Sequence, residues 1–273
     1  MTRMQPVKPT LLQIHHLDSC ESSNECLLSA AEAGAPAGTV MVAHAQTAGR
    51  GRRGRAWIGE PGKTLTFSVL WTFPVTPVVL NGLSLAMGVA LARALHLPHL
   101  GTRKAGARFG LKWPNDVLLR VADQTDAKVG GILIESTIRK APDGSRELAA
   151  VIGIGLNCLS SGALKAMVSE QNVAAVSDGF HDAEGLTPEV LLPTVLEYVQ
   201  ETLVAFSETG FESLREAWQA ANLWQGDLVC VKEIDQVLLE GTIQGIDKDG
   251  ALLLATPSGV ERIVTGDVSL RKV

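Results

Sequence analysis

Four arginines and three glycines fall within the nine residues GRGRRGRAW, from Gly49 to Trp57. Guanidinium groups stay charged and offer paired N–H donors that match carboxylate or phosphate oxygens. Glycine removes side-chain bulk, so that backbone N–H groups can also approach an anion. Trp57 adds an aromatic face that could border an adenine. This segment, here called the Arg/Gly loop (residues 49–57), predicts a site for an anion with several oxygens.

The alternative is a solvated basic loop or a nucleic-acid patch. The chain has 273 residues, a formal net charge of -5 and a 46% hydrophobic composition. An acidic globular chain lacks the basic face that binding to a nucleic-acid backbone requires, so any basic function must be local. The loop also follows an apolar, β-branched segment, Gly38–Gln46, which predicts a buried strand, and sites are common beside such strands. Both observations favour the anion site.

The cysteines and the apolar runs limit the class of protein. Cys20, Cys26, Cys158 and Cys230 form no C-x-x-C pair, which argues against a zinc site or a disulfide framework. We expect them to be small buried residues in a reducing cytoplasm. The N-terminus has no apolar run typical of a signal peptide, and no stretch reaches the ~18 apolar residues of a membrane span. A cytoplasmic protein without membrane contact is expected.

Two other motifs fail on their spacing. PGKT, residues 61–64, resembles the end of a P-loop, but Trp57 stands where the first glycine is needed and the segment opens a strand. GLSLA, residues 82–86, nearly matches a nucleophile elbow, yet Ala86 replaces the last glycine within a helical stretch. Ser84 is therefore expected to pack rather than react.

Periodicity and turn residues predict the elements that position the loop. Ser22 and Glu25 have the spacing of a capping box for a helix that Gly34 ends in a left-handed conformation. Further helices are predicted over 80–97, 187–208 and 211–221, and strands over 38–46, 64–71, 128–136 and 149–158. LKWPNDVLLR, residues 111–120, predicts strand, tight turn and strand. Glycines inside the strands KVGGILIES and AAVIGIGLNC indicate a floor that a ligand can approach closely.

The pattern changes after Trp224, where short strands alternate with Gly/Asp turns and no helical stretch occurs. This composition predicts a small all-β module similar to a compact barrel. We therefore divide the chain into residues 1–224 and residues 225–273.

Four motifs occur in order at suitable spacing: GRGRRGRAW, KWPND (112–116), KVGGILIES (128–136) and GIGLN (153–157). With Ser22-Ser23-Asn24 in place of a Ser-Thr-Asn motif, the chain resembles biotin protein ligases over essentially its whole length. The resemblance implies an α+β fold: a mixed, class II synthetase-like sheet flanked by helices, shared with lipoate ligases, and then an SH3-like β-barrel. Residues 1–224 would bind biotin and ATP, and residues 225–273 would form the barrel.

The resemblance also implies a two-step reaction. Biotin and ATP, with Mg²⁺, give biotinyl-5′-AMP and pyrophosphate, and a lysine of a biotin carboxyl carrier protein then takes the biotin and releases AMP. Two anions meet in the first step, so a preorganised Arg/Lys/Mg²⁺ clamp lowers the barrier. No side-chain nucleophile is needed. The hydrolysable mixed anhydride calls for a closing loop.

Site residues follow from the same resemblance. The expected catalytic cations are Lys128, Arg50 and Arg52. The expected biotin contacts are Ser22, Ser23, Asn24, Gln46, Arg50, Gly51, Arg52, Lys128, Gly130 and Gly131. The expected nucleotide contacts are Arg52, Arg55, Trp57, Asn115, Asp116 and Asn157, with Asp116 near Mg²⁺. Arg53 is expected to face solvent, Lys112 to pair with a carboxylate, and residues 160–168 to form a second closing segment.

Some features depart from the family. GTRKAGARFG, residues 101–110, is longer than usual and is expected to fray, with contact to the carrier as the alternative. Only 21 residues precede Ser22, too few for the DNA-binding domain of bifunctional members, so no DNA binding is expected. A monomer and a homodimer both stay open. The competing functions are lipoate or octanoate transfer, a DNA-binding biotin sensor, and a binding module without catalysis.

Overall fold

A computed structural model describes residues 11–75, 79–121, 126–162, 172–233, 236–264 and 268–273. Its larger sheet has seven strands in the order β1-β2-β3-β7-β6-β5-β4. All neighbours are antiparallel except β1 and β2. The strands are β1 (Gln13–Leu17), β2 (Thr39–Ala43), β3 (Thr64–Pro74), β4 (Arg108–Lys112), β5 (Asp116–Arg120), β6 (Ala127–Lys140) and β7 (Arg146–Asn157).

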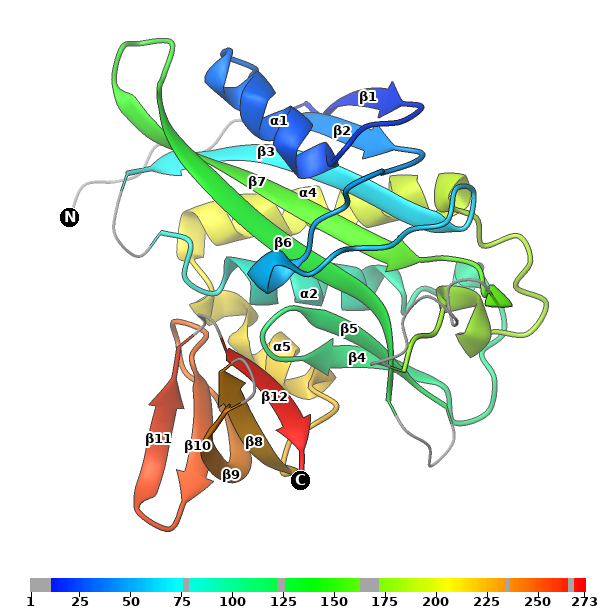
Figure 1. The fold of residues 1–273 in the computed structure, drawn as a ribbon, viewed down its shortest axis with the longest axis vertical. Coiled ribbons are helices and arrows are strands. Elements are labelled where there is room, and N and C mark those ends of the chain that lie inside the picture. The colour runs from blue at the N-terminus through cyan, green and yellow to red at the C-terminus, as the bar shows by residue number, and fades with distance from the viewer. Residues whose placement is uncertain (1–10, 76–78, 122–125, 163–171, 234–235, 265–267) are drawn as a thin grey trace.

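Helices cover both faces of this sheet, with α1 on one face and α2 and α4 on the other (Figure 1). Strand β3 shows why, because its side chains alternate between the faces. Phe67 and Val69 join the large core that α2 and α4 complete, whereas Leu70 packs in a small cluster with Leu27 and Ala31 of α1. The helices are α1 (Ser23–Glu32), α2 (Leu83–Ala94), α4 (Pro188–Thr209) and α5 (Arg215–Ala221).

The C-terminal module is a five-stranded antiparallel sheet in the order β11-β10-β9-β8-β12. It does not close into a hydrogen-bonded barrel within the described residues, although it lies where the SH3-like barrel was expected. Its strands are β8 (Leu228–Glu233), β9 (Gln236–Ile246), β10 (Leu252–Thr256), β11 (Gly259–Ile263) and β12 (Val268–Lys272).

The module packs tightly against the rest of the chain. Trp113 is buried and donates its indole N–H to the carbonyl oxygen of Gly250 at 3.1 Å. Val231 and Leu252 belong to the same buried cluster as the helices behind the large sheet. The predicted boundary after Trp224 falls in the connection between α5 and β8, which separates two sheets that share one core.

Most predicted elements exist, with shifted ends. The strand-turn-strand prediction for residues 111–120 is confirmed as β4 and β5. The predicted strand over 128–136 is longer, because β6 and β7 extend beyond α1 as a hairpin (Figure 1). The helix predicted over 211–221 begins with a 3₁₀ turn, Glu212–Leu214, before α5. The sequence interpretation missed β1, which is short and largely exposed.

The expectation that residues 101–110 fray is wrong. Their backbone pairs with residues 179–181: Lys104 N donates to Gly179 O at 3.0 Å, and His181 N to Thr102 O at 2.8 Å. The Arg103 guanidinium lies 5.9 Å from the ring centroids of Phe109 and Phe180. The two rings stack on each other with centroids 5.6 Å apart, and Arg103 lies beside this pair. The cation–π contact holds the loop, because it stabilises the partly buried charge.

Two of the four cysteines also differ from expectation. Cys158 and Cys230 are buried, but Cys20 and Cys26 are only partly buried. Burial and the adjacent Cys26 thiol raise the pKa of Cys20 to about 11. All four are free thiols. In the parts of the chain that the structure describes, no helix is long and apolar enough to cross a membrane.

The start of α2 gives a test of the packing. Gly82 has a φ of +76°, and a methyl group there would lie 2.5 Å from Cβ of Phe211. We expect Gly82→Ala to lower the free energy of unfolding by about 3 kcal/mol, from strain and overpacking together. Gly34→Ala is the control, since Gly34 has a φ of +95° and open space around it, and should cost about 1 kcal/mol. Equal losses in urea unfolding would contradict the packing argument.

Candidate active site

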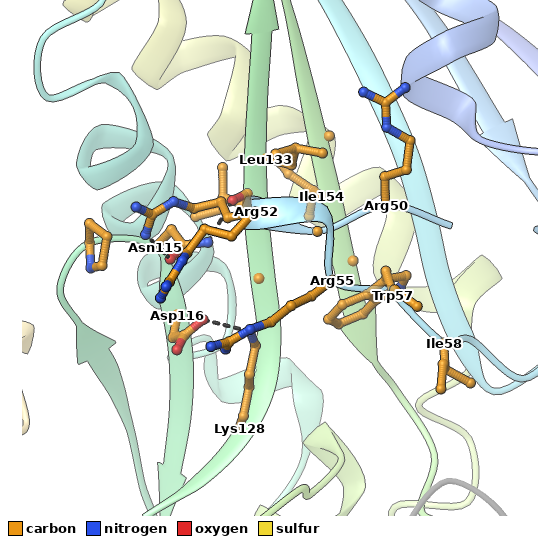
Figure 2. A pocket seen from close by; sticks show the side chains of 18 of the residues that line it. Arg50, Arg52, Arg55, Trp57, Ile58, Asn115, Asp116, Lys128, Leu133 and Ile154 are labelled. Atoms are coloured by element: carbon orange, nitrogen blue, oxygen red, sulfur yellow. Dashed lines mark hydrogen bonds and ion pairs between the residues drawn. The ribbon is translucent and has the colours of Figure 1, made fainter. Parts of the chain in front are cut away.

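A cavity of about 420 Å³ opens on the face of the large sheet that carries α1. Figure 2 shows its cationic side chains and Trp57 above the strands that form its floor. Its walls come from the start of α1, the Arg/Gly loop, the turn between β4 and β5, strands β6 and β7, and residues 268–271 of the C-terminal module.

Strand β7 explains why the space is hollow. On the face toward α1, Ala149 and Val151 pack against the helix, and the next two residues on that face are Gly153 and Gly155. A methyl group on Gly153 would lie 2.2 Å from Oδ1 of Asn24, and one on Gly155 would lie 2.2 Å from the Trp57 ring. The glycines predicted a close approach to the strand. They allow the side chains of Asn24 and Trp57 to lie directly against the backbone of β7.

One end of the cavity is a buried polar cluster. Ser22, Ser23 and Asn24 are each at most 3% exposed. Oε1 of Gln46 accepts a hydrogen bond from Ser23 N at 2.7 Å. Ser68 Oγ lies 2.8 Å from Ser23 Oγ and 2.6 Å from Asn24 Oδ1. Sequence reasoning missed Ser68, although a serine within the apolar strand TLTFSVLW is a signal that it serves a neighbouring polar group.

The predicted capping box is wrong. Ser22 is the N-cap residue of α1, but its side chain makes no capping hydrogen bond. The Glu25 side chain is 55% exposed and lies 3.9 Å from Arg50 instead of turning back to Ser22. The prediction for the other end of the helix is confirmed, since Gly34 follows the C-cap with a φ of +95°. Ser22 is thus free of the capping role and faces the cavity.

The Arg/Gly loop is a narrow hairpin held by its own backbone. Gly51 N donates to Arg55 O at 2.7 Å, and Trp57 N donates to Gly49 O at 2.8 Å. Arg53 sits at its tip with a φ of +61°. The expectation that Arg53 faces solvent is wrong, because it lines the cavity and its Nη1 is buried without a partner among the described residues.

The arginines of the loop take different directions (Figure 2). Arg52 donates from Nη1 to Oδ1 of Asn115 at 3.1 Å. Arg50 points away from Arg52 and pairs with the carboxylate of Glu135 on β6. Asn115 in turn donates from Nδ2 to a β6 carbonyl, Ile132 O, at 2.8 Å, which fixes the turn between β4 and β5.

Asp116 organises the cations at the other end of the cavity. Its Oδ1 lies 2.6 Å from Nζ of Lys128, and its Oδ2 lies 3.6 Å from Nζ of Lys112, which confirms a carboxylate partner for Lys112. Burial alone would raise the pKa of Asp116, but Lys128, Lys112 and Arg52 hold it below its ordinary value. Burial, Arg271 and Lys128 lower the pKa of Lys112, against the opposing effect of Asp116.

Positive charge exceeds negative charge along the cavity. Asp116 is the one acidic side chain among the described lining residues. The cationic lining residues are Arg50, Arg52, Arg53, Arg55, Lys112, Lys128 and Arg271. Five of these cations are partly buried, and Arg50 and Arg55 are exposed. Cations that outnumber the nearby carboxylates favour an anion, so this end of the cavity is suited to phosphate or carboxylate oxygens. Arg271 comes from β12, and nothing in its local sequence points to a site.

Besides Nη1 of Arg53, two buried polar atoms of the described cavity lining lack partners. They are Nε1 of Trp57 and Oδ1 of Asn157. The other end of the Asn157 amide is occupied, because its Nδ2 donates to Ala174 O at 3.1 Å. A heteroaromatic ligand can form hydrogen bonds with this buried donor and acceptor while it lies against the aromatic ring. The Lys128 ammonium lies 5.9 Å from the Trp57 ring and joins this region to the cationic one.

The structure gathers nearly all predicted site residues around one cavity. Gly130 is the exception: it is absent from the lining, and a methyl group there would lie 2.9 Å from Gly155 O. Of the predicted closing segment 160–168, residues 163–168 lie outside the described residues. The residues that line the cavity as predicted are Ser22, Ser23, Asn24, Gln46, Arg50, Gly51, Arg52, Arg55, Trp57, Asn115, Asp116, Lys128, Gly131 and Asn157. Their ligand contacts stay predictions.

The contact between Trp57 and Gly155 gives the first test of the site. We expect Gly155→Ala to lift the Trp57 ring off β7, because the added methyl group has no space. Acrylamide should then quench tryptophan fluorescence more strongly than in the native chain. The same substitution in a Trp57→Phe background is the control and should change nothing, since the other four tryptophans are buried. Equal quenching in both backgrounds would contradict this placement of the ring.

Asp116 gives a second test. Its pKa is lowered on folding, so its charge stabilises the fold above its ordinary pKa of 3.8, and this contribution is lost as the pH falls through the folded-state pKa. We expect Asp116→Asn to lower the free energy of unfolding by about 3 kcal/mol, equally at pH 7 and pH 5. Asp143→Asn, in an exposed turn, should cost far less. A difference between native and Asp116→Asn chains that vanishes by pH 5 would contradict the lowered pKa.

Residues 18–157 match the biotin/lipoate A/B protein ligase family, and residues 231–271 match the biotin protein ligase C terminal domain. The bifunctional ligase/repressor BirA of Escherichia coli is 31% identical over 86% of this chain and 67% of its own length. The biotin--[acetyl-CoA-carboxylase] ligase of Paracoccus denitrificans is 31% identical over 84% of this chain and 88% of its own length.

Solved structures agree with these relatives. The biotin protein ligase from Aquifex aeolicus in complex with biotin and ATP superposes with a TM-score of 0.69 and 26% identity, covering 95% of this chain and 99% of that one. The predicted mixed sheet with flanking helices and a small C-terminal β module is confirmed by this match. Both halves of the chain thus lead to one assignment: it belongs to the biotin/lipoate A/B protein ligase family and, within it, to the biotin protein ligases.

Proposed function

We propose that this chain is an ATP-dependent biotin protein ligase. In the first step, a biotin carboxylate oxygen bonds to the α-phosphorus of ATP and pyrophosphate leaves. In the second, the ε-amine of a carrier lysine bonds to the carbonyl carbon of biotinyl-5′-AMP and AMP leaves. The observation that carries the proposal is the single cavity with a buried polar cluster at one end and excess positive charge at the other.

The cations at one end of the cavity reduce the main barrier to the first step, which is the repulsion between two anions. Two unit charges of the same sign brought to 4 Å repel by about 4 kcal/mol at the effective dielectric constant of a protein surface. Lys128, held by Asp116 at 2.6 Å, is the cation best placed to lie between the carboxylate and the phosphate. Arg52 is fixed by Asn115 beside it. Because these charges are in place beforehand, they stabilise charge in the transition state without reorganisation.

The two ends of the cavity divide the substrate. We assign the ureido ring of biotin to the buried cluster of Ser22, Ser23, Asn24 and Gln46, whose donors and acceptors suit a cyclic urea. We assign the adenine to the Trp57 ring, with Asn157 Oδ1 as an open acceptor for an amino group. The carboxylate of biotin then meets the α-phosphate between the two regions.

Mg²⁺ belongs to the same proposal as an ion that arrives with ATP. Mg²⁺ usually keeps several waters and takes one or two carboxylates together with substrate phosphates. The described residues contain no group of three or more His, Cys, Asp or Glu that could hold a metal. Asp116 is the carboxylate in the described cavity lining that would hold such an ion, beside Lys112 and Lys128.

The acceptor is proposed to be a biotin carboxyl carrier protein, and the location to be the cytoplasm, where ATP is available. Lipoate transfer is the alternative within the same fold family. The match of residues 231–271 to the C-terminal domain of biotin protein ligases favours biotin.

Mass spectrometry tests the function directly. The protein would be mixed with biotin, ATP and Mg²⁺, with and without a biotin carboxyl carrier domain, and with lipoic acid in parallel. We expect biotinyl-5′-AMP in the absence of carrier and a biotin mass gain on the carrier lysine in its presence. A gain with lipoic acid and none with biotin would move the chain to the lipoate branch. No product with either acid would refute the proposal.

Lys128 gives a residue-level prediction. We expect Lys128→Met to lower kcat/KM for biotin by about 10²–10³-fold, because it removes a cation that the transition state needs more than the ground state. Pyrophosphate release would be the measurement. Lys248→Met is the control, since Lys248 is exposed in the turn between β9 and β10, and it should leave the rate unchanged. A loss below tenfold for Lys128→Met would contradict the assigned role.

A further inference from the structure

One carboxylate holds two parts of the site together. Glu135 lies on β6 with its side chain 20% exposed. Its Oε2 accepts a hydrogen bond from Nδ2 of Asn24 at 2.9 Å, and its Oε1 forms an ion pair with Arg50. Asn24 belongs to the buried polar cluster, and Arg50 opens the Arg/Gly loop. The two oxygens of Glu135 therefore connect Asn24 with Arg50, which lies 26 residues further along the chain.

Asn24 depends on this contact for its orientation. Its Oδ1 accepts from Ser68 Oγ at 2.6 Å, and its other amide donor distance, to Leu133 O, is 3.4 Å. Glu135 thus supplies the closest acceptor for the amide N–H₂ among the described residues. A carboxylate there admits only the N–H₂ group, so it fixes which end of the Asn24 amide faces Ser68.

Arg50 depends on the same contact for its direction. In Figure 2 its guanidinium points away from Arg52, Arg55 and Lys128. It lies against Glu135, with Glu25 at 3.9 Å as a second, more exposed carboxylate. The expectation that Arg50 covers the ligand carboxylate does not describe this arrangement, because its charge is already matched by Glu135.

We propose that Glu135 is a positioning residue, which fastens the Arg/Gly loop to the buried polar cluster through Arg50 and Asn24. In this arrangement Arg50 anchors the base of the loop, and Arg52 and Arg55 are the arginines left to meet the phosphate. Removing the charge of Glu135 releases the loop and frees the Asn24 amide to turn. The placement of the loop is independent of the proposed function, whereas the effect on biotin rests on it.

Limited trypsin digestion tests the loop, since trypsin cleaves after arginine and the loop contains four. We expect Glu135→Gln, which keeps the shape and removes the charge, to raise cleavage within residues 50–55 of the free protein about 5- to 10-fold. Glu147→Gln is the matched control, because Glu147 is 19% exposed and pairs with Arg139 at 2.8 Å, away from the loop. Equal increases in both variants, or none in Glu135→Gln, would overturn the proposal.

Steady-state kinetics tests the link to Asn24. We expect Glu135→Gln to raise KM for biotin about 5- to 10-fold, with kcat within about twofold, because ground-state positioning by Asn24 is lost while Lys128, on β6 outside the loop, stays in place. Glu147→Gln should leave both constants unchanged. An unchanged KM would overturn the link, even if cleavage of the loop increases. If the native chain turns over no biotin, the proposed function fails. The digestion result still decides whether Glu135 fastens the Arg/Gly loop.

Discussion

The ion pairs of Asp116 are the interaction on which the cavity depends. Lys128 on β6 and Lys112 on β4 approach within 4 Å of one buried carboxylate, so each lysine avoids the full cost of an unpaired buried charge. Without Asp116 the two ammonium groups would repel each other and turn toward solvent. The turn between β4 and β5 places this carboxylate between them. The large sheet is therefore the frame that brings three charges to one point.

The same sheet separates packing from binding by the alternation of its side chains. On the α2 and α4 face of β7, Ile152, Ile154 and Leu156 fill the core. On the α1 face, Ala149 and Val151 hold the helix, and Gly153 and Gly155 leave room for the Asn24 and Trp57 side chains. One strand thus stabilises the fold along one face and seats two side chains of the cavity lining on the other.

The sequence predicted the residues whose positions depend on a local pattern or on a single motif. Lys128, Asp116 and Asn157 all line the cavity, because each lies in a motif whose spacing is fixed by one strand or one turn. It did not predict the direction of single side chains. Nothing in the spacing of Arg50 distinguishes a ligand contact from a pair with Glu135, since that carboxylate lies 85 residues further along the chain.

Three residues lie where the sequence interpretation did not place them. Glu25 has the spacing of a capping residue, yet its carboxylate lies 3.9 Å from Arg50, a neighbour that the local spacing does not specify. Gly130 lies next to Gly131 in the same motif but on the opposite face, as the period of two requires. Arg271 lies far outside every motif and joins the site only because β12 packs beside it.

An aromatic contact joins β12 to the large sheet, in addition to the pairing of β12 with β8. Trp224 lies between Lys112, at 4.5 Å, and Lys272 of β12, at 5.3 Å, and its Nε1 donates to Asp126 at 2.7 Å. The Lys112 ammonium thus contacts both the Trp224 ring and the Asp116 carboxylate. Because Lys272 adjoins Arg271, the contact that seats the C-terminal module also brings an arginine to the cationic end of the cavity. The C-terminal module therefore forms part of the cavity wall, although the boundary after Trp224 separates its sheet from the large sheet.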